Sequence, residues 1–164
     1  MTTIKMKHCL ILFIVGFQFF CYKSFAKTDT TNVYYQALKL HLEYWNNFHS
    51  ERPDLVKIPT TYFVESDYYS TEGLPDTIAG HQIQYLTHNE IRIKTKGGKS
   101  FPLIAVRPVR WDSRRNLLII AVIDFTVSRT RRTTNYANGG GSSFEVVCNQ
   151  NSKVSLRIIN QGGI

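Results

Sequence analysis

The sequence predicts an α+β domain in which an N-terminal helix packs on a four- to five-stranded antiparallel sheet. Three observations support this prediction: apolar residues at helical spacing in residues 32–48, several strand-like segments after residue 60, and tight connections between the last four of them. Strands joined by short connections pair antiparallel. The helix would then cover the apolar face of the sheet.

The predicted first helix carries its apolar side chains three and four residues apart, which places them on one helical face. These residues are Tyr34, Leu38, His41, Trp45 and Phe48. Asn32 or either threonine before it can cap the first turn. Pro53 ends the helix at the latest, because proline disfavours helical geometry in the residue before it.

Residues 88–96 are predicted to form a second, shorter helix. Thr87 and Glu90 have the spacing of a capping box. A cationic last turn and a glycine stop follow, in Lys94, Lys96 and Gly97. A strand is the rival interpretation, because apolar and cationic residues also alternate over residues 91–94.

The later strands are predicted at residues 101–110, 117–127, 144–148 and 154–159. The second of these is apolar on both faces, so it should be the most buried, and Asp124 is its one charge. Residues 133–143 are predicted to form a flexible loop, because they include the glycines at 139–141. A phosphate loop would need a lysine and a helix after these glycines, and neither follows.

The first 26 residues have the features of a secretory signal peptide. Two lysines precede an apolar run from Cys9 to Cys21, and small residues stand at Ser24 and Ala26, where a signal peptidase would cut. The run is too short for a membrane span, and Phe20 is too large to precede a lipidated Cys21. We therefore expect residues 27–164 to form a single exported domain, periplasmic or extracellular, without a transmembrane segment after cleavage.

Composition limits the possible functions of this domain. The net charge falls from +8 to about +5 on cleavage, because the signal peptide holds three lysines and no acid. Only Cys148 remains, so no intrachain disulfide can form, and its strand position predicts a buried core thiol. The histidines are scattered without a metal-binding spacing, and no cofactor or specific nucleic-acid motif is present.

Seven of the ten arginines fall between residues 107 and 132. Because the strand at 117–127 separates them, one group should lie at each end of the sheet. The group formed by Arg129, Arg131 and Arg132 is the candidate anion site, because a guanidinium donates paired hydrogen bonds to phosphate, sulfate or carboxylate. The alternative is that these charges only solvate the strand ends and protect the sheet edges.

His41 lies within the apolar stripe of the first helix, between Leu38 and Trp45. The simplest interpretation is a core histidine with a hydrogen-bond partner. The alternative is an acid–base residue in a cavity between helix and sheet, with Trp45 beside it and Asp124 or Glu65 facing it.

The element order resembles the cystatin-like and nuclear-transport-factor-like layouts, in which a long helix lies across a curved sheet. The segments LPDTIAGHQIQYL and IDFTVSRTRRTTNYANGGG also resemble small exported bacterial proteins of uncharacterised function. This resemblance implies a helix-on-sheet fold. It assigns no catalytic residue.

Three functions remain open from the sequence. The first is a non-enzymatic exported binding protein with an anionic ligand or a protein partner. The second is a small enzyme or ligand-sequestering domain with a cavity near His41. The third is an inhibitor or assembly component that pairs through a sheet edge.

Overall fold

The long N-terminal helix forms where the apolar spacing predicts it. Helix α2, Val33–Glu51, begins at Asn32, whose side-chain oxygen accepts hydrogen bonds from the backbone N–H groups of Tyr34 and Tyr35 at 2.9 and 3.3 Å. These bonds satisfy two of the donors that a helix leaves free at its start. The computed structural model describes residues 32–52, 58–148 and 153–163. The predicted signal peptide, its cleavage site and Pro53 lie outside the described residues.

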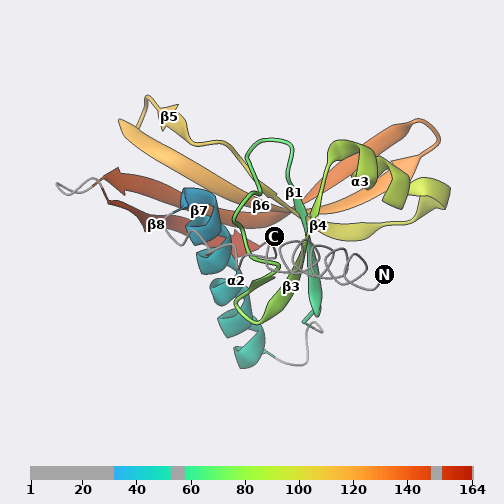
Figure 1. Cartoon of the computed structure of the whole chain (residues 1–164), viewed down its shortest axis with the longest axis horizontal. Helices are drawn as coiled ribbons and strands as arrows, with labels where there is room; N and C mark the ends of the chain where they lie inside the picture. Colours follow the sequence, from blue (N-terminus) through green and yellow to red (C-terminus); the bar gives the residue numbers. More distant parts are fainter. Residues whose placement is uncertain (1–31, 53–57, 149–152, 164) are drawn as a thin grey trace, which may run out of the picture.

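The strands form one curled sheet beside α2, so the prediction of an α+β fold with a helix on a sheet is confirmed (Figure 1). The sheet order is β2-β3-β1-β4-β6-β7-β8, and β5 pairs with β6. The strands are β1 Thr61–Glu65, β2 Thr77–Ile78, β3 His81–Leu86, β4 Phe101–Val106, β5 Arg110–Asp112, β6 Leu117–Thr130, β7 Thr133–Cys148 and β8 Val154–Gly163.

The predicted antiparallel sheet of four to five strands is wrong in its detail, because the sheet is larger and mixed. Strand β1 pairs parallel with both β3 and β4, whereas the remaining pairs are antiparallel. Parallel neighbours need a long crossover connection. Residues 66–80 provide one between β1 and β3, and that stretch has two glycines and a proline, as a loop does, so its sequence does not indicate which strands it joins.

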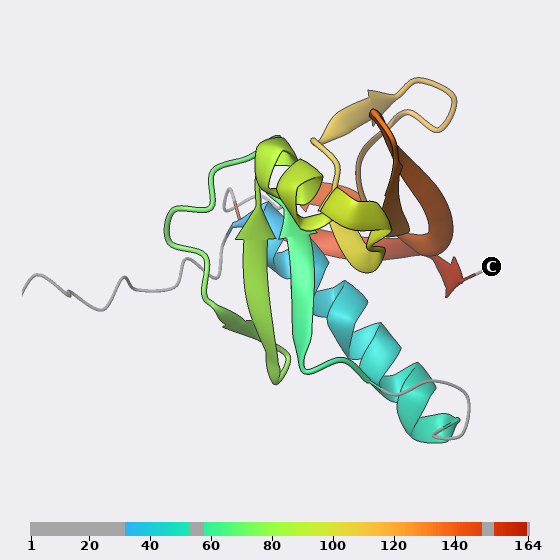
Figure 2. The same cartoon turned by 90° about the vertical axis from the view of Figure 1, so that its right-hand side faces the viewer.

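Each face of the sheet has its own apolar cluster. Along β4, Ile104 and Val106 pack with Leu38 and Leu42 of α2, whereas Phe101 and Leu103 belong to a second cluster. The second cluster also contains Ile91, from helix α3, His88–Lys94. Successive strand residues point to opposite faces, so α2 covers one face of the sheet and α3 covers part of the other (Figure 2).

The glycine-rich segment lies within β7, so the predicted loop at residues 133–143 is wrong. The pairing of β6 with β7 shifts between Asp124 and Phe125, which leaves Gly139 as an extra residue in β7. This is a β-bulge, and a bulge bends and twists the strands that contain it. Figure 1 shows the long β6–β7 hairpin changing direction near its middle.

Gly141 makes this bulge possible. A Cβ atom added there would lie 2.2 Å from the carbonyl oxygen of Val122, and the residue has φ +152°. Both the contact and the backbone conformation exclude a side chain. The glycines therefore specify a bent strand and not a flexible loop.

The structure also corrects the prediction for Cys148, which is exposed and not buried. Phe144 is fully buried in the core, but Cys148 is the last residue of β7 and lies beyond the end of the apolar cluster. The alternation of side chains between the two faces of a strand therefore does not predict burial at Cys148, because no apolar cluster among the described residues covers the strand there. Among the described residues, no helix combines the length and apolar character needed to cross a membrane.

We predict that Gly141→Ala lowers the free energy of unfolding by about 2 kcal/mol or more, because the new methyl group collides with the β6 backbone. Gly162→Ala is the matched control, since a Cβ atom there has no heavy atom within 4 Å. Urea denaturation of both variants measures the difference. Equal stabilities would contradict the assignment of the bend to Gly141.

Candidate functional site

One end of the molecule is built from α3, the 3₁₀ turn η1 and the tip of the β6–β7 hairpin. Helix α3 has the predicted capping box: Thr87 accepts from the backbone of Glu90, and the Glu90 carboxylate accepts from the Thr87 N–H at 2.8 Å. Asp67 also accepts from the His88 N–H, at 2.6 Å. These contacts confirm the helix interpretation over the strand. They also fix the position of the cationic residues that follow.

The turn η1, Lys96–Gly98, packs against β6. Its two glycines both have φ +75° and carry no side chain, so the backbone there is open. Facing it, residues 131 and 132 form the tight turn between β6 and β7, and Arg131 has φ +51°. A non-glycine residue in this left-handed region is strained unless it is asparagine or aspartate. Arginine is therefore not a residue type that suits the backbone conformation of this turn.

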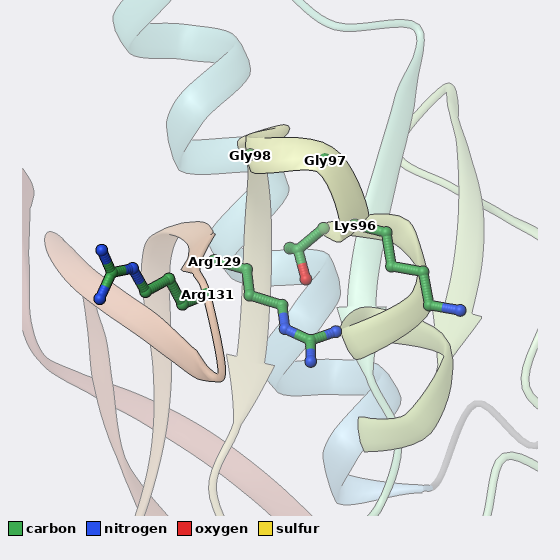
Figure 3. A pocket seen from close by; sticks show the side chains of 6 residues that line it. Lys96, Gly97, Gly98, Arg129 and Arg131 are labelled. Atoms are coloured by element: carbon green, nitrogen blue, oxygen red, sulfur yellow. The ribbon is translucent and has the colours of Figure 1, made fainter.

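Arg129 lines a hollow of about 430 Å³ between these two elements, and its side chain lies between those of Arg131 and Lys96 (Figure 3). The hollow is lined by Thr95, Lys96, Gly97, Gly98, Arg129 and Arg131. Nη1 of Arg129 donates to the carbonyl oxygen of Arg92, at the end of α3, at 3.3 Å. Its Nε is buried and has no hydrogen-bond partner. The guanidinium is therefore held in place with a donor still unused.

Two further hollows adjoin this one. The first has a volume of about 400 Å³ and shares Lys96, and its lining adds Lys94, Lys99 and Phe101. The second has a volume of about 810 Å³, shares Arg131 and adds Arg132. The six cations of these hollows are named here the basic surface: Lys94, Lys96, Lys99, Arg129, Arg131 and Arg132.

The basic surface carries no acidic neighbour in sequence. Residues 91–111 and 125–144 contain no aspartate or glutamate. Gathering like charges without interspersed acids opposes folding through self-repulsion, and an ordinary solvated surface mixes both signs. The local excess of positive charge is thus greater than the net charge of the chain suggests.

The second arginine group differs in this respect. It lies on the β5–β6 hairpin, at the opposite end of β6, as the strand length predicts. There Asp112 accepts from the backbone of Arg114 and Arg115 and lies 3.9 Å from the Arg115 guanidinium. This group therefore has a local counter-charge and an ordinary turn structure.

The structure brings together the predicted Arg129, Arg131 and Arg132 and adds three lysines that sequence reasoning did not assign to the site. Lys94, Lys96 and Lys99 surround the glycine stop of α3. In the sequence, Lys94 and Lys96 indicate only a helix terminus, and no pattern assigns a role to Lys99. The lack of aspartate and glutamate in the sequence around these lysines is the signal from which their place in the site could be predicted. Lys94 also lies over the Phe63 ring, 3.9 Å from its centre, which holds its ammonium group on this surface.

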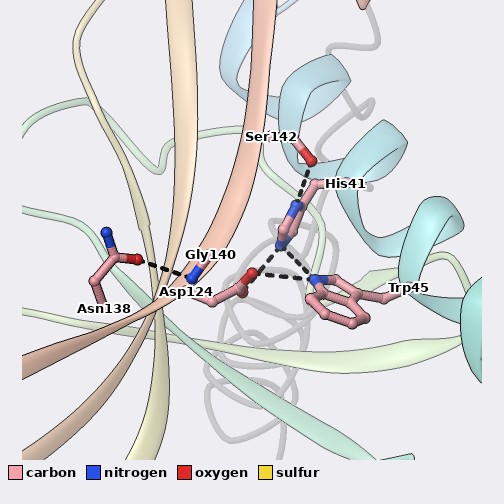
Figure 4. Close-up of polar contacts among 6 residues, drawn as sticks. All are labelled: His41, Trp45, Asp124, Asn138, Gly140 and Ser142. Atoms are coloured by element: carbon pink, nitrogen blue, oxygen red, sulfur yellow. Dashed lines mark hydrogen bonds and ion pairs between the residues drawn. The ribbon is translucent and has the colours of Figure 1, made fainter. Parts of the chain in front are cut away.

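His41, Trp45 and Asp124 also meet, at the bend of the β6–β7 hairpin (Figure 4). Nε2 of His41 lies 3.0 Å from Oδ1 of Asp124, and Nδ1 lies 2.8 Å from the hydroxyl of Ser142. The indole N–H of Trp45 donates to Oδ2 of Asp124 at 3.1 Å. A carboxylate only accepts, so Nε2 carries hydrogen, and Nδ1 of a neutral ring accepts from Ser142.

These residue types resemble a hydrolase triad, but their arrangement does not. His41 has an exposed fraction of 0%, and Ser142 has 3%. The serine faces Nδ1 and the acid faces Nε2, which reverses the roles that a nucleophilic serine requires. The contacts instead connect α2 to both strands of the bent hairpin, which is the arrangement expected of a core histidine with satisfied partners.

Glu65, the other predicted partner of His41, lies on the opposite face of the sheet from Val64 and the α2 cluster. It is paired with Arg107 at 3.5 Å. Burial raises the pKa of Glu65, and the Arg107 guanidinium offsets part of the increase. This buried acid therefore belongs to a separate ion pair.

Comparison with protein-family models, curated proteins and solved structures found no match to this chain. Within the residues that the structure describes, no group of three or more histidine, cysteine or acidic residues is placed to hold a metal ion.

We predict that Asp124→Ala lowers the free energy of unfolding by about 1–3 kcal/mol, because it removes the acceptor that His41 and Trp45 share and leaves the Trp45 N–H only the His41 Nε2, at 3.2 Å. In the Asp124→Ala/Trp45→Phe double variant one of these donors is gone, so the loss should be about 1 kcal/mol less than the sum of the single losses. Chemical denaturation of the four proteins measures this coupling. Strictly additive losses would contradict the shared carboxylate.

Proposed function

We propose that this chain is an exported, non-enzymatic binding protein that takes an anionic ligand on the basic surface. The observation that supports the proposal is the gathering of six cations from two separate chain segments around neighbouring hollows, whose lining among the described residues includes no acidic side chain. Electrostatic attraction of this kind raises both the rate and the strength of anion binding. Arginine adds paired, directional hydrogen bonds to phosphate, sulfate or carboxylate groups.

The backbone at Arg131 supports a ligand-binding role over simple solvation. Its φ of +51° costs stability that asparagine or glycine would avoid. Strained residues of this kind concentrate at binding sites. A charge needed only for solubility has no reason to occupy the strained position of the turn.

A cavity function at His41 has less support. Its ring is fully buried, and both ring nitrogens are engaged by Ser142 and Asp124. A ligand would have to displace one of these contacts. We therefore place the proposed site on the basic surface, on the side of the sheet that α3 covers.

A second candidate function is pairing through the sheet edge. Strand β8 ends the sheet order, and Ile158 on it is 53% exposed. Long apolar edge strands tend to pair with other chains. A dimer in size-exclusion chromatography that Ile158→Lys abolishes would support this function independently of anion binding.

We predict that the triple variant Arg129→Ala/Arg131→Ala/Arg132→Ala loses at least about tenfold in affinity for heparin or inorganic polyphosphate at low salt. Protein with a saturating probe should show a higher melting temperature, and the variant should lose that shift. High salt should remove the shift from the unmodified protein as well.

The matched control is Arg110→Ala/Arg114→Ala/Arg115→Ala, which removes the same charge from the opposite end of β6. It should retain most of the affinity. Equal losses in both triple variants would reduce the effect to net charge and contradict a localised site.

We also predict that Arg131→Asn raises the free energy of unfolding by up to about 1 kcal/mol while weakening probe binding, because asparagine tolerates the left-handed conformation. The control is Arg132→Asn, which removes the same charge from the same turn at a residue that has no positive φ. Arg132→Asn should therefore weaken binding without a gain in stability. Chemical denaturation measures the stability of each variant, and calorimetric titration measures its affinity for the probe. An Arg131→Asn protein that is no more stable than Arg132→Asn would contradict the strain argument.

A further inference from the structure

We infer that the ligand is a flexible linear polyanion bearing phosphate or sulfate groups, which lies along the basic surface from Lys99 to Arg132. This inference rests on the proposed anion-binding function and specifies its substrate class. It depends on three observations: the adjacency of the hollows, the directions of their cations, and the character of the remaining lining residues.

The hollows lie next to one another, because neighbouring hollows share a lining residue, and together they are called the track here. Lys96 lines both the hollow that contains Lys99 and the hollow that contains Arg129. Arg131 lines both the Arg129 hollow and the one that contains Arg132. A chain that crosses the central hollow therefore meets cationic groups on both sides of it.

The cations diverge, which disfavours a single small anion. In Figure 3 the side chains of Lys96 and Arg131 extend in opposite directions, away from each other, and Arg129 lies between them. One phosphate ion could contact Arg129 but not all three groups in this arrangement. A chain of repeated charges offers each cation its own anionic group, so divergent cations fit an extended ligand.

Arg129 is suited to be the central anchor of that ligand. The Arg92 carbonyl accepts from its Nη1 and so fixes the direction of the guanidinium beside the hollow. An orientated guanidinium loses less conformational freedom on binding than a free side chain does. The outer lysines and arginines would then add charge contacts along the chain.

The lining favours a polymer of phosphate or sulfate groups without bases over a nucleic acid or a membrane surface. Its one aromatic residue, Phe101, is only 9% exposed and lies beneath Lys94, so the track offers no open ring on which bases stack. Its one strongly exposed apolar side chain is Ile93. A membrane-binding face needs a larger apolar area.

The test measures affinity of the full chain for orthophosphate, tripolyphosphate and longer polyphosphates by calorimetric titration at several salt concentrations. We expect affinity per chain to rise with length. The slope of log K against log salt should steepen from about −1 for orthophosphate to about −3 or steeper for long chains, because more counterions are released. Titrations with heparin, with single-stranded DNA of equal charge and with anionic lipid vesicles show which kind of anionic ligand binds most tightly.

Two variants at the ends of the track make the test sharper. Lys99→Ala and Arg132→Ala should each weaken long polyphosphate several-fold and reduce the salt slope by about one, while leaving tripolyphosphate unchanged. Arg129→Ala should weaken both probes. Arg110→Ala, outside the track, should affect neither.

The outcomes separate the two proposals. Binding of phosphate that does not depend on chain length, or equal effects of the end variants on short and long probes, would retain the anion site and overturn the linear ligand. Tighter binding of DNA or of vesicles than of polyphosphate and heparin would also overturn it, in favour of those partners. Absence of binding to every probe would overturn the proposed function itself.

Discussion

The bulge in the β6–β7 hairpin is the constraint on which the arrangement of this protein depends. One half of the hairpin packs its core face, including Ile120, Val122 and Phe144, against α2. Beyond the bulge, Val127 packs with Ile91 of α3 on the other face of the sheet. A regular hairpin has no reason to change direction there. The extra residue at Gly139 and the absence of a side chain at Gly141 permit the change.

The polar contacts of His41 hold this bend in position. Asp124 stands at the register shift, and Ser142 follows the glycines, so both bonds from His41 join α2 to the bend itself. A buried histidine with unsatisfied nitrogens would be costly, and its partners are available only when the bulge is in register. The network therefore favours one hairpin geometry over neighbouring registers, in which these groups would lack partners.

The sequence predicts those elements whose signals are local. The capping residues of both helices, the apolar spacing of α2 and the strands around the last hairpin all depend on neighbours within a few residues, and the structure confirms them. The parallel pairing of β1 depends on which strands meet after a long connection, and no local pattern reports that. The glycines of β7 were misinterpreted because a bulge and a loop have the same composition.

The candidate site, like the fold, has features that the sequence predicts and features that it does not. The separation of the arginines into two groups follows from the length of one strand, so it was predictable. The contribution of Lys94, Lys96 and Lys99 was not, because it requires α3 to pack beside the tip of a hairpin that lies about thirty residues further along the chain. The partners of His41 were predictable in part, since Asp124 was the one charge in an apolar strand.

The basic surface is not required by the fold that displays it. The core on both faces of the sheet is apolar, and the bend is fixed by glycines and by the His41 contacts. Of the six cations, Lys94 contacts the rings of the second cluster, and the other five are not in the apolar clusters or the His41 contacts. Several features of the surface instead oppose stability: like charges without acids, an arginine at positive φ, and a buried guanidinium nitrogen without a partner. An anionic ligand would relieve the first of these costs directly, by neutralising the charge. The unbalanced positive charge that destabilises the free protein is therefore the feature that would make binding favourable.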